Sequence, residues 1–449
     1  MGAEALRFIE AVLLNLGTLL THAWQLGAME VALTSVPFLV VLELPFQLVL
    51  MLGILKWAYD ERLRAPKTVP YSPRVTCLVI CYSEGEMVKT TLRSLTEQIY
   101  PGHIELVVVV DGARRNRETL LAVEALVPYI QGIPRRSIVV LPKFQRGGRV
   151  SSANLGLKTA TGDIIMAIDG DTSFDNDMVA CAVRYFVEPG VVAVAGNLRV
   201  RNASHSLATR LQALEYMLAI HACRIGLDQL NAVNNISGAF GVFRTDLVRR
   251  IGGWDSGTAE DLDITLRIKK YFRRHPGMRI RFAPDAIGHT DAPETLRGFF
   301  FQRLRWDGDL YYLYVRKHLR SLRPGLLGWP NFLMLVWTGF LFQLVMPFVI
   351  IGYTVYTLVV YPAAFTVAVF TFVYLAYVLL TLVFFLQYLL ACSERPRNDL
   401  VYLCYVPLFP LLMFASRAWC GVSTVMEIAL KAHLDSSMAP WWVLRKTKF

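Results

Sequence analysis

Charged residues are scarce in this sequence, and one long stretch has none. They make up 18% of the 449 residues, against the roughly 25% that is usual in soluble domains, and the mean hydropathy is +0.41. No Asp, Glu, Lys or Arg occurs from Pro324 to Ser393. That length accommodates two membrane helices of about 20 residues each, which argues against a wholly soluble protein. Tyr361-Pro362 predicts the break between the two helices.

Cysteine is also rare. The seven cysteines are scattered and form no Cys-x-x-Cys pair, which argues against a disulfide framework and against a zinc site. Acidic residues are fewer than basic ones, and the net charge is +11. This excess fits either a phosphate-bearing partner or the positive-inside bias of a membrane protein. The positive-inside bias accounts for most of the excess charge, because the basic clusters flank apolar runs. No nucleic-acid partner is predicted.

Other apolar runs predict further membrane segments. Val31–Leu55 is a third candidate span, interrupted only by Glu43. That carboxylate marks either a translocation path or a packed interface between helices. Ala11–Leu20 is a second N-terminal span or an interfacial helix, and Leu400–Ala415 is a bent span or an interfacial helix that leads into one. The basic flanks predict a multi-pass protein of the cell membrane, with the middle and the end of the chain in the cytoplasm.

Between roughly Tyr71 and Pro324 the composition is that of a soluble domain. Stretches of helical character alternate with short apolar, β-branched runs, which predicts a mainly parallel α/β sheet. The expected strands are Val75–Ile80, Leu106–Val110, Ile138–Leu141, Ile164–Ile168 and Val191–Ala195. Ligands bind at the carboxyl ends of the strands in such sheets.

Polar clusters follow four of these strands. They are Tyr82-Ser83-Glu84, Asp111-Gly112, Asp169-Gly170-Asp171, and Asn197 with Arg199. Each has an ordinary explanation as a helix cap or a turn. When Asp111-Gly112 is considered by itself, the turn is the favoured explanation. Two carboxylates on a tight turn, as in Asp169-Gly170-Asp171, can also hold a hard divalent cation that neutralises a diphosphate leaving group.

Two later motifs add further candidate chemistry. Glu260-Asp261 stands where a helix is expected to begin; its carboxylates either stabilise that helix end or supply a general base. Gln302-Arg303-Leu304-Arg305-Trp306 lies just before the long uncharged stretch. It is either one face of an amphipathic helix or a binding site, because an Arg fork suits diphosphate oxygens and a Trp face suits a sugar ring.

As an ordered set, these motifs resemble the membrane-bound, processive family-2 glycosyltransferases, which include cellulose, hyaluronan and poly-N-acetylglucosamine synthases. The resemblance covers about Val75 to Trp306. The stretch Ser237–Arg244 is similar to the family's acceptor-side loop. The sequence departs from the family pattern at Val110, where an Asp is common, at Gly148-Arg149, which stands for Gly-Lys, and at Asp307-Gly308-Asp309, an additional acidic pair.

The resemblance implies a set of donor-side residues. Tyr82, Glu84 and Asp111 would contact the nucleotide, and Arg149 would lie near the diphosphate. Asp169 and Asp171 would face the donor, with Asp171 the direct ligand of Mg²⁺ or Mn²⁺.

It also implies an acceptor side. Asp261 would be the general base, supported by Glu260. Gln302, Arg305 and Trp306 would bind the diphosphate and the acceptor sugar.

The resemblance further implies a GT-A-like, Rossmann-like α/β catalytic domain joined to a transmembrane helix bundle. The expected divisions are residues 1–66 (membrane segment of one or two helices), 67–294 (cytoplasmic catalytic domain), 295–325 (amphipathic interface helices) and 326–449 (transmembrane helices and basic tail).

The implied activity is inverting transfer from a UDP-sugar, first of all UDP-N-acetylglucosamine, to a growing β-linked polysaccharide that crosses the bilayer, with an accessory export or regulatory subunit as a further partner. A hyaluronan- or cellulose-type synthase, or a membrane enzyme that adds one sugar to a lipid, is the alternative. From another class, a transporter or receptor with a nucleotide-binding domain also fits parts of the pattern.

Overall fold

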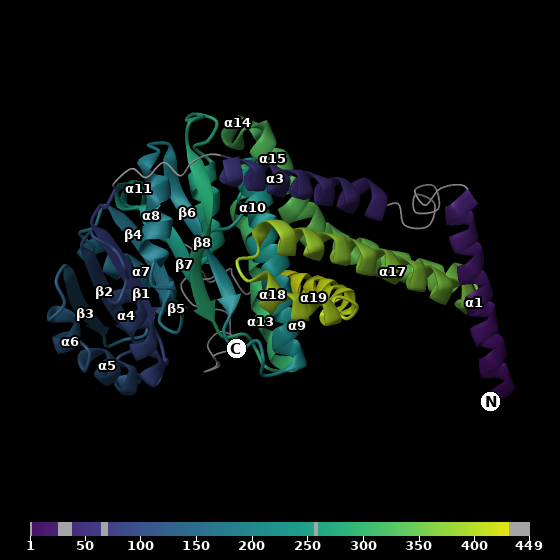
Figure 1. Cartoon of the computed structure of the whole chain (residues 1–449), viewed down its shortest axis with the longest axis horizontal. Helices are drawn as coiled ribbons and strands as arrows, with labels where there is room; N and C mark the ends of the chain where they lie inside the picture. Colours follow the sequence, from purple (N-terminus) through teal and green to yellow (C-terminus); the bar gives the residue numbers. More distant parts are fainter. Residues whose placement is uncertain (1, 26–37, 64–70, 256–258, 431–449) are drawn as a thin grey trace.

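The computed structural model describes residues 2–25, 38–63, 71–255 and 259–430 (Figure 1). The predicted basic tail, at 431–449, lies outside the described residues. A sheet with its covering helices occupies one end of the molecule, and long helices extend from it toward the other end, where α1 (Gly2–Gln25) lies. The chain therefore has an α/β part and a helical part, as predicted.

The α/β part is built on one eight-stranded sheet. The strand order is β3-β2-β1-β4-β7-β6-β8-β5. β1 pairs in parallel with β2 and β4, β2 with β3, and β6 with β8, whereas β7 is antiparallel to β4 and β6, and β5 to β8. The strands are β1 (Val75–Cys81), β2 (Ile104–Asp111), β3 (Arg136–Lys143), β4 (Ile164–Asp169), β5 (Ser173–Phe174), β6 (Val191–Val200), β7 (Phe240–Arg244) and β8 (Arg279–Thr290).

All five predicted strands are present, and the sheet is mainly parallel as predicted. Three further strands were missed. β7 lies in the stretch that resembles a loop of the family, and β8 is interrupted by Pro284. β6 runs on to Val200, so that Asn197 and Arg199 lie within the strand and not after it, as the sequence had suggested.

Both faces of the sheet are covered, which explains the continuous apolar runs. In β1, Leu78 and Ile80 face one apolar cluster, and Cys77 and Val79 face another. The covering helices include α4 (Val88–Thr96), α5 (Arg117–Glu124), α6 (Val127–Gln131), α7 (Gly148–Thr159), α8 (Met178–Val183), α9 (Leu207–Glu215), η4 (Tyr216–Ala222), α10 (Cys223–Asp228), α11 (Thr245–Arg250) and α12 (Glu260–Lys269). All seven cysteines are free.

The described residues include four helices that are long and apolar enough to cross a membrane. They are Leu39–Glu61, Trp329–Val360, Ala363–Cys392 and Phe409–Ala429. Pro362 caps the helix of the third, so the predicted break is confirmed. These spans contain η1 (Leu39–Glu43), most of α3 (Leu44–Leu63), α15 (Trp329–Leu335), η7 (Val336–Val345), α16 (Met346–Val360), α17 (Ala363–Gln387), η8 (Tyr388–Cys392) and most of α19 (Phe409–Leu430).

The structure also bears on the alternatives left open for Glu43 and for two further apolar segments. Glu43 forms an ion pair with Arg417 of α19 at 2.5 Å, which supports the packed-interface alternative. Leu400–Tyr405 forms a short 3-10 helix (η9) before α19, so this segment leads into a span. The stretch 11–20 lies within α1, which packs beside α17 and is not one of the four candidate spans.

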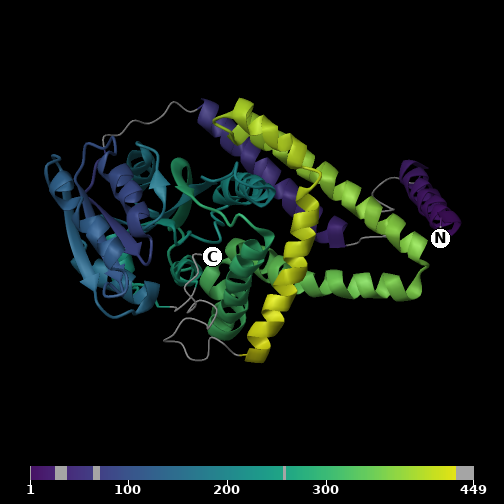
Figure 2. The same ribbon diagram turned by 90° about the horizontal axis from the view of Figure 1, so that it is seen from below.

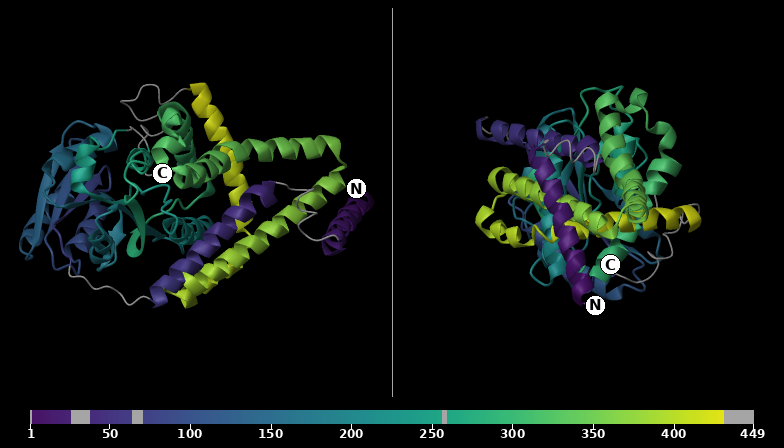
Figure 3. Two further views of the ribbon diagram at one scale, coloured as in Figure 1. Left: turned by 90° about the horizontal axis from the view of Figure 1, so that it is seen from above. Right: turned by 90° about the vertical axis from the view of Figure 1, so that its right-hand side faces the viewer.

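The helical part is attached to the α/β part by close packing. Figures 2 and 3 show α3 running beside the later part of α17, and Gln387 donates to the carbonyl of Met51 at 2.8 Å. α3 also lies against α10 at a pair of glycines, where a Cβ on Gly53 would stand 2.7 Å from the carbonyl oxygen of Gly226. The two backbones approach this closely only because neither residue has a side chain.

Candidate active site

The turn after β1 carries Tyr82, Ser83 and Glu84. Ser83 has a φ of 71°, in the left-handed region that non-glycine residues rarely adopt. This conformation brings the Glu84 carboxylate back to the backbone N–H of Tyr82, which donates to Oε1 at 2.8 Å. The ring of Tyr82 is covered by the guanidinium of Arg146 at 4.3 Å. Tyr82 and Glu84 are thus held at the carboxyl end of the sheet.

Asp111, at the end of β2, is buried and organises the start of α7. Its Oδ1 accepts from the N–H of Gly147 and its Oδ2 from the N–H of Gly148, both at 2.9 Å. Lys143 contributes an ion pair at 3.0 Å. Gly148 has a φ of 78° and therefore suits this turn. Asp111 anchors the helix end that presents Arg149.

The acidic turn after β4 lies against Glu84. A Cβ on Gly170 would stand 3.2 Å from the carboxyl carbon of Glu84, so the turn and that side chain are in contact. Burial, together with the charges of Asp171 and Asp169, raises the pKa of Glu84 to about 7. Glu84 Oε2 is buried and has no hydrogen-bond partner among the described residues. Three carboxyl groups therefore gather at this edge.

Arg149 links this acidic turn to the start of α12. Its guanidinium forms ion pairs with Asp169 and with Glu260, and it donates to the carbonyl of Gly238. Burial alone would lower the pKa of Arg149, but the two carboxylates raise it above its usual value. Burial raises the pKa of Glu260 to about 7, against the opposing effect of Arg149. The network joins motifs that lie far apart in the sequence.

Asp261 is fixed by three N–H donors. Its Oδ2 accepts from the backbone N–H of Gly238 at 3.0 Å and from Asn235 Nδ2 at 3.3 Å. Its Oδ1 accepts from the N–H of Leu262 at 2.7 Å. The helix begins at Glu260 as predicted, and the preceding Ala259 has a φ of 50°. Backbone conformations of this kind are costly and cluster at functional sites.

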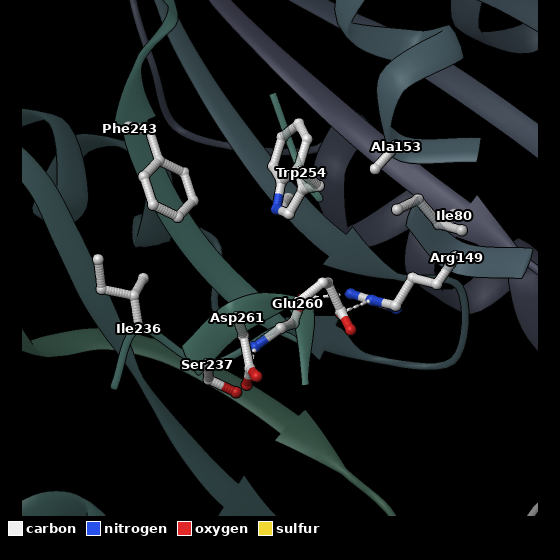
Figure 4. A pocket seen from close by; sticks show the side chains of 11 residues that line it. Ile80, Arg149, Ala153, Ile236, Ser237, Phe243, Trp254, Glu260 and Asp261 are labelled. Carbon is white, nitrogen blue, oxygen red and sulfur yellow. Dashed lines mark hydrogen bonds and ion pairs between the residues drawn. The ribbon is translucent and has the colours of Figure 1, made fainter. Parts of the chain in front are cut away.

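Of the residues described above, Arg149, Gly238, Glu260 and Asp261 line one small pocket. It is lined by Ile80, Arg149, Ala153, Ala167, Ile236, Ser237, Gly238, Phe243, Trp254, Glu260 and Asp261. Figure 4 shows Glu260 between Arg149 on one side and Asp261 with Ser237 on the other. Apolar side chains form the rest of the wall. Charges in such a water-poor setting interact more strongly than they would in bulk water.

The Gln-x-x-Arg-Trp motif lies outside this pocket, on α13 (Leu296–Tyr311). Gln302 is buried, and Trp306 is 36% exposed. Arg303 pairs with Glu215 at 2.6 Å and lies over the ring of Trp306 at 4.7 Å. The side chain of Arg305 lies outside the described residues.

α13 is attached to the membrane part, because Trp419 of α19 donates to the carbonyl of Phe300 at 2.7 Å. The motif therefore stands on the membrane side of the α/β part.

The residues fit a divalent cation only if the substrate supplies further ligands. No group of three or more His, Cys, Asp or Glu that could hold a metal ion occurs in the described parts of the chain. Asp169 is engaged by Arg149. Mg²⁺ commonly uses one or two carboxylates together with substrate phosphates, and Asp171 with Asp169 matches that minimal protein contribution.

Sequence reasoning missed several residues of the site. Asn235 contacts the carboxylate of Asp261 directly, and Arg146 covers Tyr82. Gly238, which also contacts Asp261, lies in the Ser237–Arg244 stretch that the sequence had indicated. The pair Asn234-Asn235 was the available signal for Asn235, since a buried amide group needs hydrogen-bond partners. Nothing in the sequence pairs Arg146 with Tyr82.

Comparison with known families gives a match over the same region. Residues 73–308 match the family described as glycosyltransferase like family 2. The chain belongs to glycosyltransferase family 2. The matched residues include every motif from Tyr82 to Trp306, so the family expected from the sequence is confirmed.

Relatives within the family are polysaccharide synthases. The chain is 30% identical over 251 residues to the poly-β-1,6-N-acetyl-D-glucosamine synthase of Staphylococcus aureus strain COL, covering 56% of this chain and 57% of that protein. The Staphylococcus epidermidis protein of the same name is 27% identical over 234 residues, covering 52% and 53%. The chain thus spans little more than half the length of the curated relatives it matches.

A solved structure supports the fold. The mannosyltransferase PcManGT from Pyrobaculum calidifontis, in complex with GDP-Man and Mn²⁺, superposes with a TM-score of 0.54 at 20% identity, covering 86% of this chain and 99% of that one. The GT-A-like fold class expected from the sequence is confirmed.

Proposed function

We propose that this family-2 glycosyltransferase is a membrane polysaccharide synthase that transfers N-acetylglucosamine from UDP-N-acetylglucosamine to a growing β-linked polymer. The observation that carries the proposal is the Arg149 network, which joins the acidic turn after β4 to Glu260 and leaves Asp261 beside it in the same pocket. The proposed base therefore lies in the same pocket as the guanidinium that contacts the acidic turn. The names of the staphylococcal relatives favour this sugar and this product.

The reaction proposed is inverting transfer, with Asp261 as the base. Asp261 takes the proton from the acceptor hydroxyl as that oxygen attacks C1 of the donor sugar, and the bond from C1 to the diphosphate breaks. A base must be held within hydrogen-bond reach of the proton that it takes. The three N–H donors to Asp261 supply that orientation.

On the donor side, Tyr82 and Glu84 contact the nucleotide, and Asp111 acts by anchoring the start of α7. Arg149 lies beside the diphosphate, where its guanidinium can exchange a carboxylate partner for phosphate oxygens. Asp171, with Asp169, holds Mg²⁺ or Mn²⁺, which when bound neutralises charge on the leaving diphosphate. Gln302, Arg305 and Trp306 contact the acceptor end of the site.

The membrane arrangement is also a proposal. We propose a multi-pass protein of the cell membrane, with residues 67–294 as a cytoplasmic catalytic domain and 295–325 as the interface; the four apolar helices support this proposal. Residues 1–66 and 326–449 supply the membrane segments. Because α13 is attached to α19, an acceptor held by α13 lies at the membrane surface, which suits processive extension and export.

Membranes that contain the protein, incubated with one labelled UDP-sugar at a time, test the proposal. We expect UDP release and a polymer only with UDP-N-acetylglucosamine, and digestion of that polymer by a glycosidase specific for β-linked N-acetylglucosamine. A product that carries a single sugar on a lipid would refute the synthase assignment. Turnover with a different UDP-sugar alone would refute the assigned donor.

A further inference from the structure

A buried polar cluster ties α12 to the segment that follows α13. Asp263 is fully buried, and His318 is 3% exposed. His318 Nε2 lies 2.8 Å from Asp263 Oδ1, and Lys317 Nζ lies 2.7 Å from the same oxygen. Arg267 Nε reaches Asp263 Oδ2 at 2.8 Å. With Lys270, these residues form what we call the Asp263–His318 clamp.

The hydrogen bonds of the clamp define the state of His318. Lys270 Nζ lies 2.9 Å from His318 Nδ1. An ammonium group has donors only, so Nδ1 must accept, and in neutral imidazole the proton is then on Nε2. Nε2–H therefore donates to Asp263. The clamp needs neutral His318, because a proton on Nδ1 would remove the acceptor that Lys270 uses.

The clamp connects two elements of the candidate site. α12 begins with Glu260 and Asp261, two residues before Asp263. His318 directly follows η5 (Tyr312–Lys317), which continues α13, the helix of Gln302 and Trp306. Apolar side chains make the same connection, since Leu262 and Leu266 of α12 pack in one cluster with Leu313 and Tyr314.

The clamp also fixes the segment before α12. Lys317 pairs with Asp255 at 3.0 Å. Arg267 donates to the carbonyls of Ile251 at 2.8 Å and Gly253 at 2.6 Å. Asp263 and its partners therefore connect α12, and the segment before it, to the segment that follows α13.

We propose that His318 is a positioning residue that holds Asp261 in register with the helix of Gln302 and Trp306. The proposal rests on the function proposed above, because it assigns the alignment of base and acceptor to this contact. Small displacements of a reacting group cost rate steeply, up to about 100-fold for about 1 Å. A contact that sets the spacing of two elements can therefore control turnover without touching substrate.

The charges around His318 determine how the clamp responds to a change of pH. Asp263, Lys270 and Lys317 face it, and Arg267 and Asp255 complete the cluster. Burial lowers the pKa of His318, as do Lys270 and Lys317, while Asp263 raises it. Removing the Lys270 cation should raise that pKa and also remove the contact that a proton on Nδ1 disrupts, so that protonated His318 still donates to Asp263 and the clamp stays closed at a lower pH.

The test compares His318→Ala, His318→Gln and Lys270→Met in the full-length protein, with His205→Gln as the control. The amide nitrogen of Gln can take the place of Nε2 and keep the bond to Asp263. His205 is exposed and pairs with Glu294 at the surface. We expect H318A to lower kcat about 10- to 100-fold with the KM for donor within about twofold, and H318Q to recover most of the loss. H205Q should match wild type.

Two further readouts separate positioning from mere stability. In K270M the acid limb of the kcat profile should move to lower pH, because protonated His318 no longer faces the Lys270 cation. In H318A, hydrogen exchange of residues 260–269 should be at least about 10-fold faster than in wild type, with α4 unchanged, as expected for local rather than global opening. If H318A fails to fold, the pH profile of K270M still tests the proposal.

Unchanged kcat in H318A, or kcat and folded yield that fall together in H318A and H318Q with no pH shift in K270M, would overturn the proposal. Absence of turnover by wild type with every UDP-sugar would refute the proposed function instead. The exchange measurement would then still decide whether the clamp holds α12.

Discussion

The backbone N–H of Gly238 donates to Asp261 Oδ2 at 3.0 Å, and this contact joins the turn before β7 to the first turn of α12. The same Gly238 offers its carbonyl to Arg149. A Cβ at this position would lie 3.0 Å from Glu260 Oε1, so a larger residue would require the Glu260 carboxylate to shift. The turn thereby holds the Asp261 carboxylate and the Arg149 guanidinium at a fixed separation.

Asp261→Asn should reduce transfer by about 10³-fold or more, because an amide cannot take a proton and general base catalysis contributes about 10²–10⁴-fold. Donor affinity should stay within about twofold of wild type. UDP-sugar binding and labelled-product yield measure the two effects. Asp246→Asn is the control, because that exposed carboxylate contacts only its helix neighbours Arg250 and Leu247 in the hydrogen bonds and ion pairs of the described residues. Normal polymer yield from D261N would rule out Asp261 as the base.

Arg149→Lys should lower kcat/KM for the donor by about tenfold, and Arg149→Met by about 100-fold, since an ammonium cannot reproduce the forked contact. The guanidinium lowers the pKa of Glu260. In R149M, Glu260 should therefore hold its proton to a pH above about 7. The pH dependence of UDP release measures both effects. Equal activity in R149K and wild type would show that charge alone is sufficient.

Glu260→Gln should flatten the dependence of stability on pH. The pKa of Glu260 is raised by burial from 4.5 to about 7, so the folded protein binds this proton more tightly than the unfolded chain does. The stabilisation from protonated Glu260 is full below about 4.5 and is lost as pH rises through about 7. The difference in Tm between E260Q and wild type in detergent, followed from pH 4.5 to 8, measures it. A constant difference would contradict the raised pKa.

Removal of divalent metal should abolish UDP release. EDTA-treated protein is expected to regain activity with Mg²⁺ or Mn²⁺, because charge on the leaving diphosphate must be neutralised. Asp171→Asn should raise the metal concentration for half-maximal activity at least about tenfold. Full activity in EDTA, or a D171N enzyme with unchanged metal dependence, would exclude this role.

Gly53→Val should destabilise the attachment of α3 to α10 by about 1–3 kcal/mol, the usual cost of overpacking. Its Cβ would stand 2.7 Å from a backbone oxygen of Gly226. Gly352→Val, in a span where a Cβ meets nothing within 4 Å, is the matched control. Thermal unfolding in detergent compares the two, and equal Tm values would show that the glycine contact is unimportant.

The sequence by itself determined the uncharged apolar helices between Pro324 and Ser393, the parallel strands and the family, whereas the last apolar helix, Phe409–Ala429, lies further along the chain than the expected Leu400–Ala415. Those properties follow from local composition, since an uncharged run must leave water and strands buried on both faces are continuously apolar. It also predicted that Asp169, Glu260 and Asp261 belong to one site.

Only the tertiary structure decided how those residues are joined. Arg149, Asn235 and Gly238 reach the carboxylates across large sequence distances, and no periodicity encodes such contacts. The strand β7 was missed because its antiparallel place between β4 and β6 is a property of the assembled sheet. The Gln302–Trp306 motif could be predicted to lie near the membrane, but its separation from the small pocket depends on how α13 packs against α19.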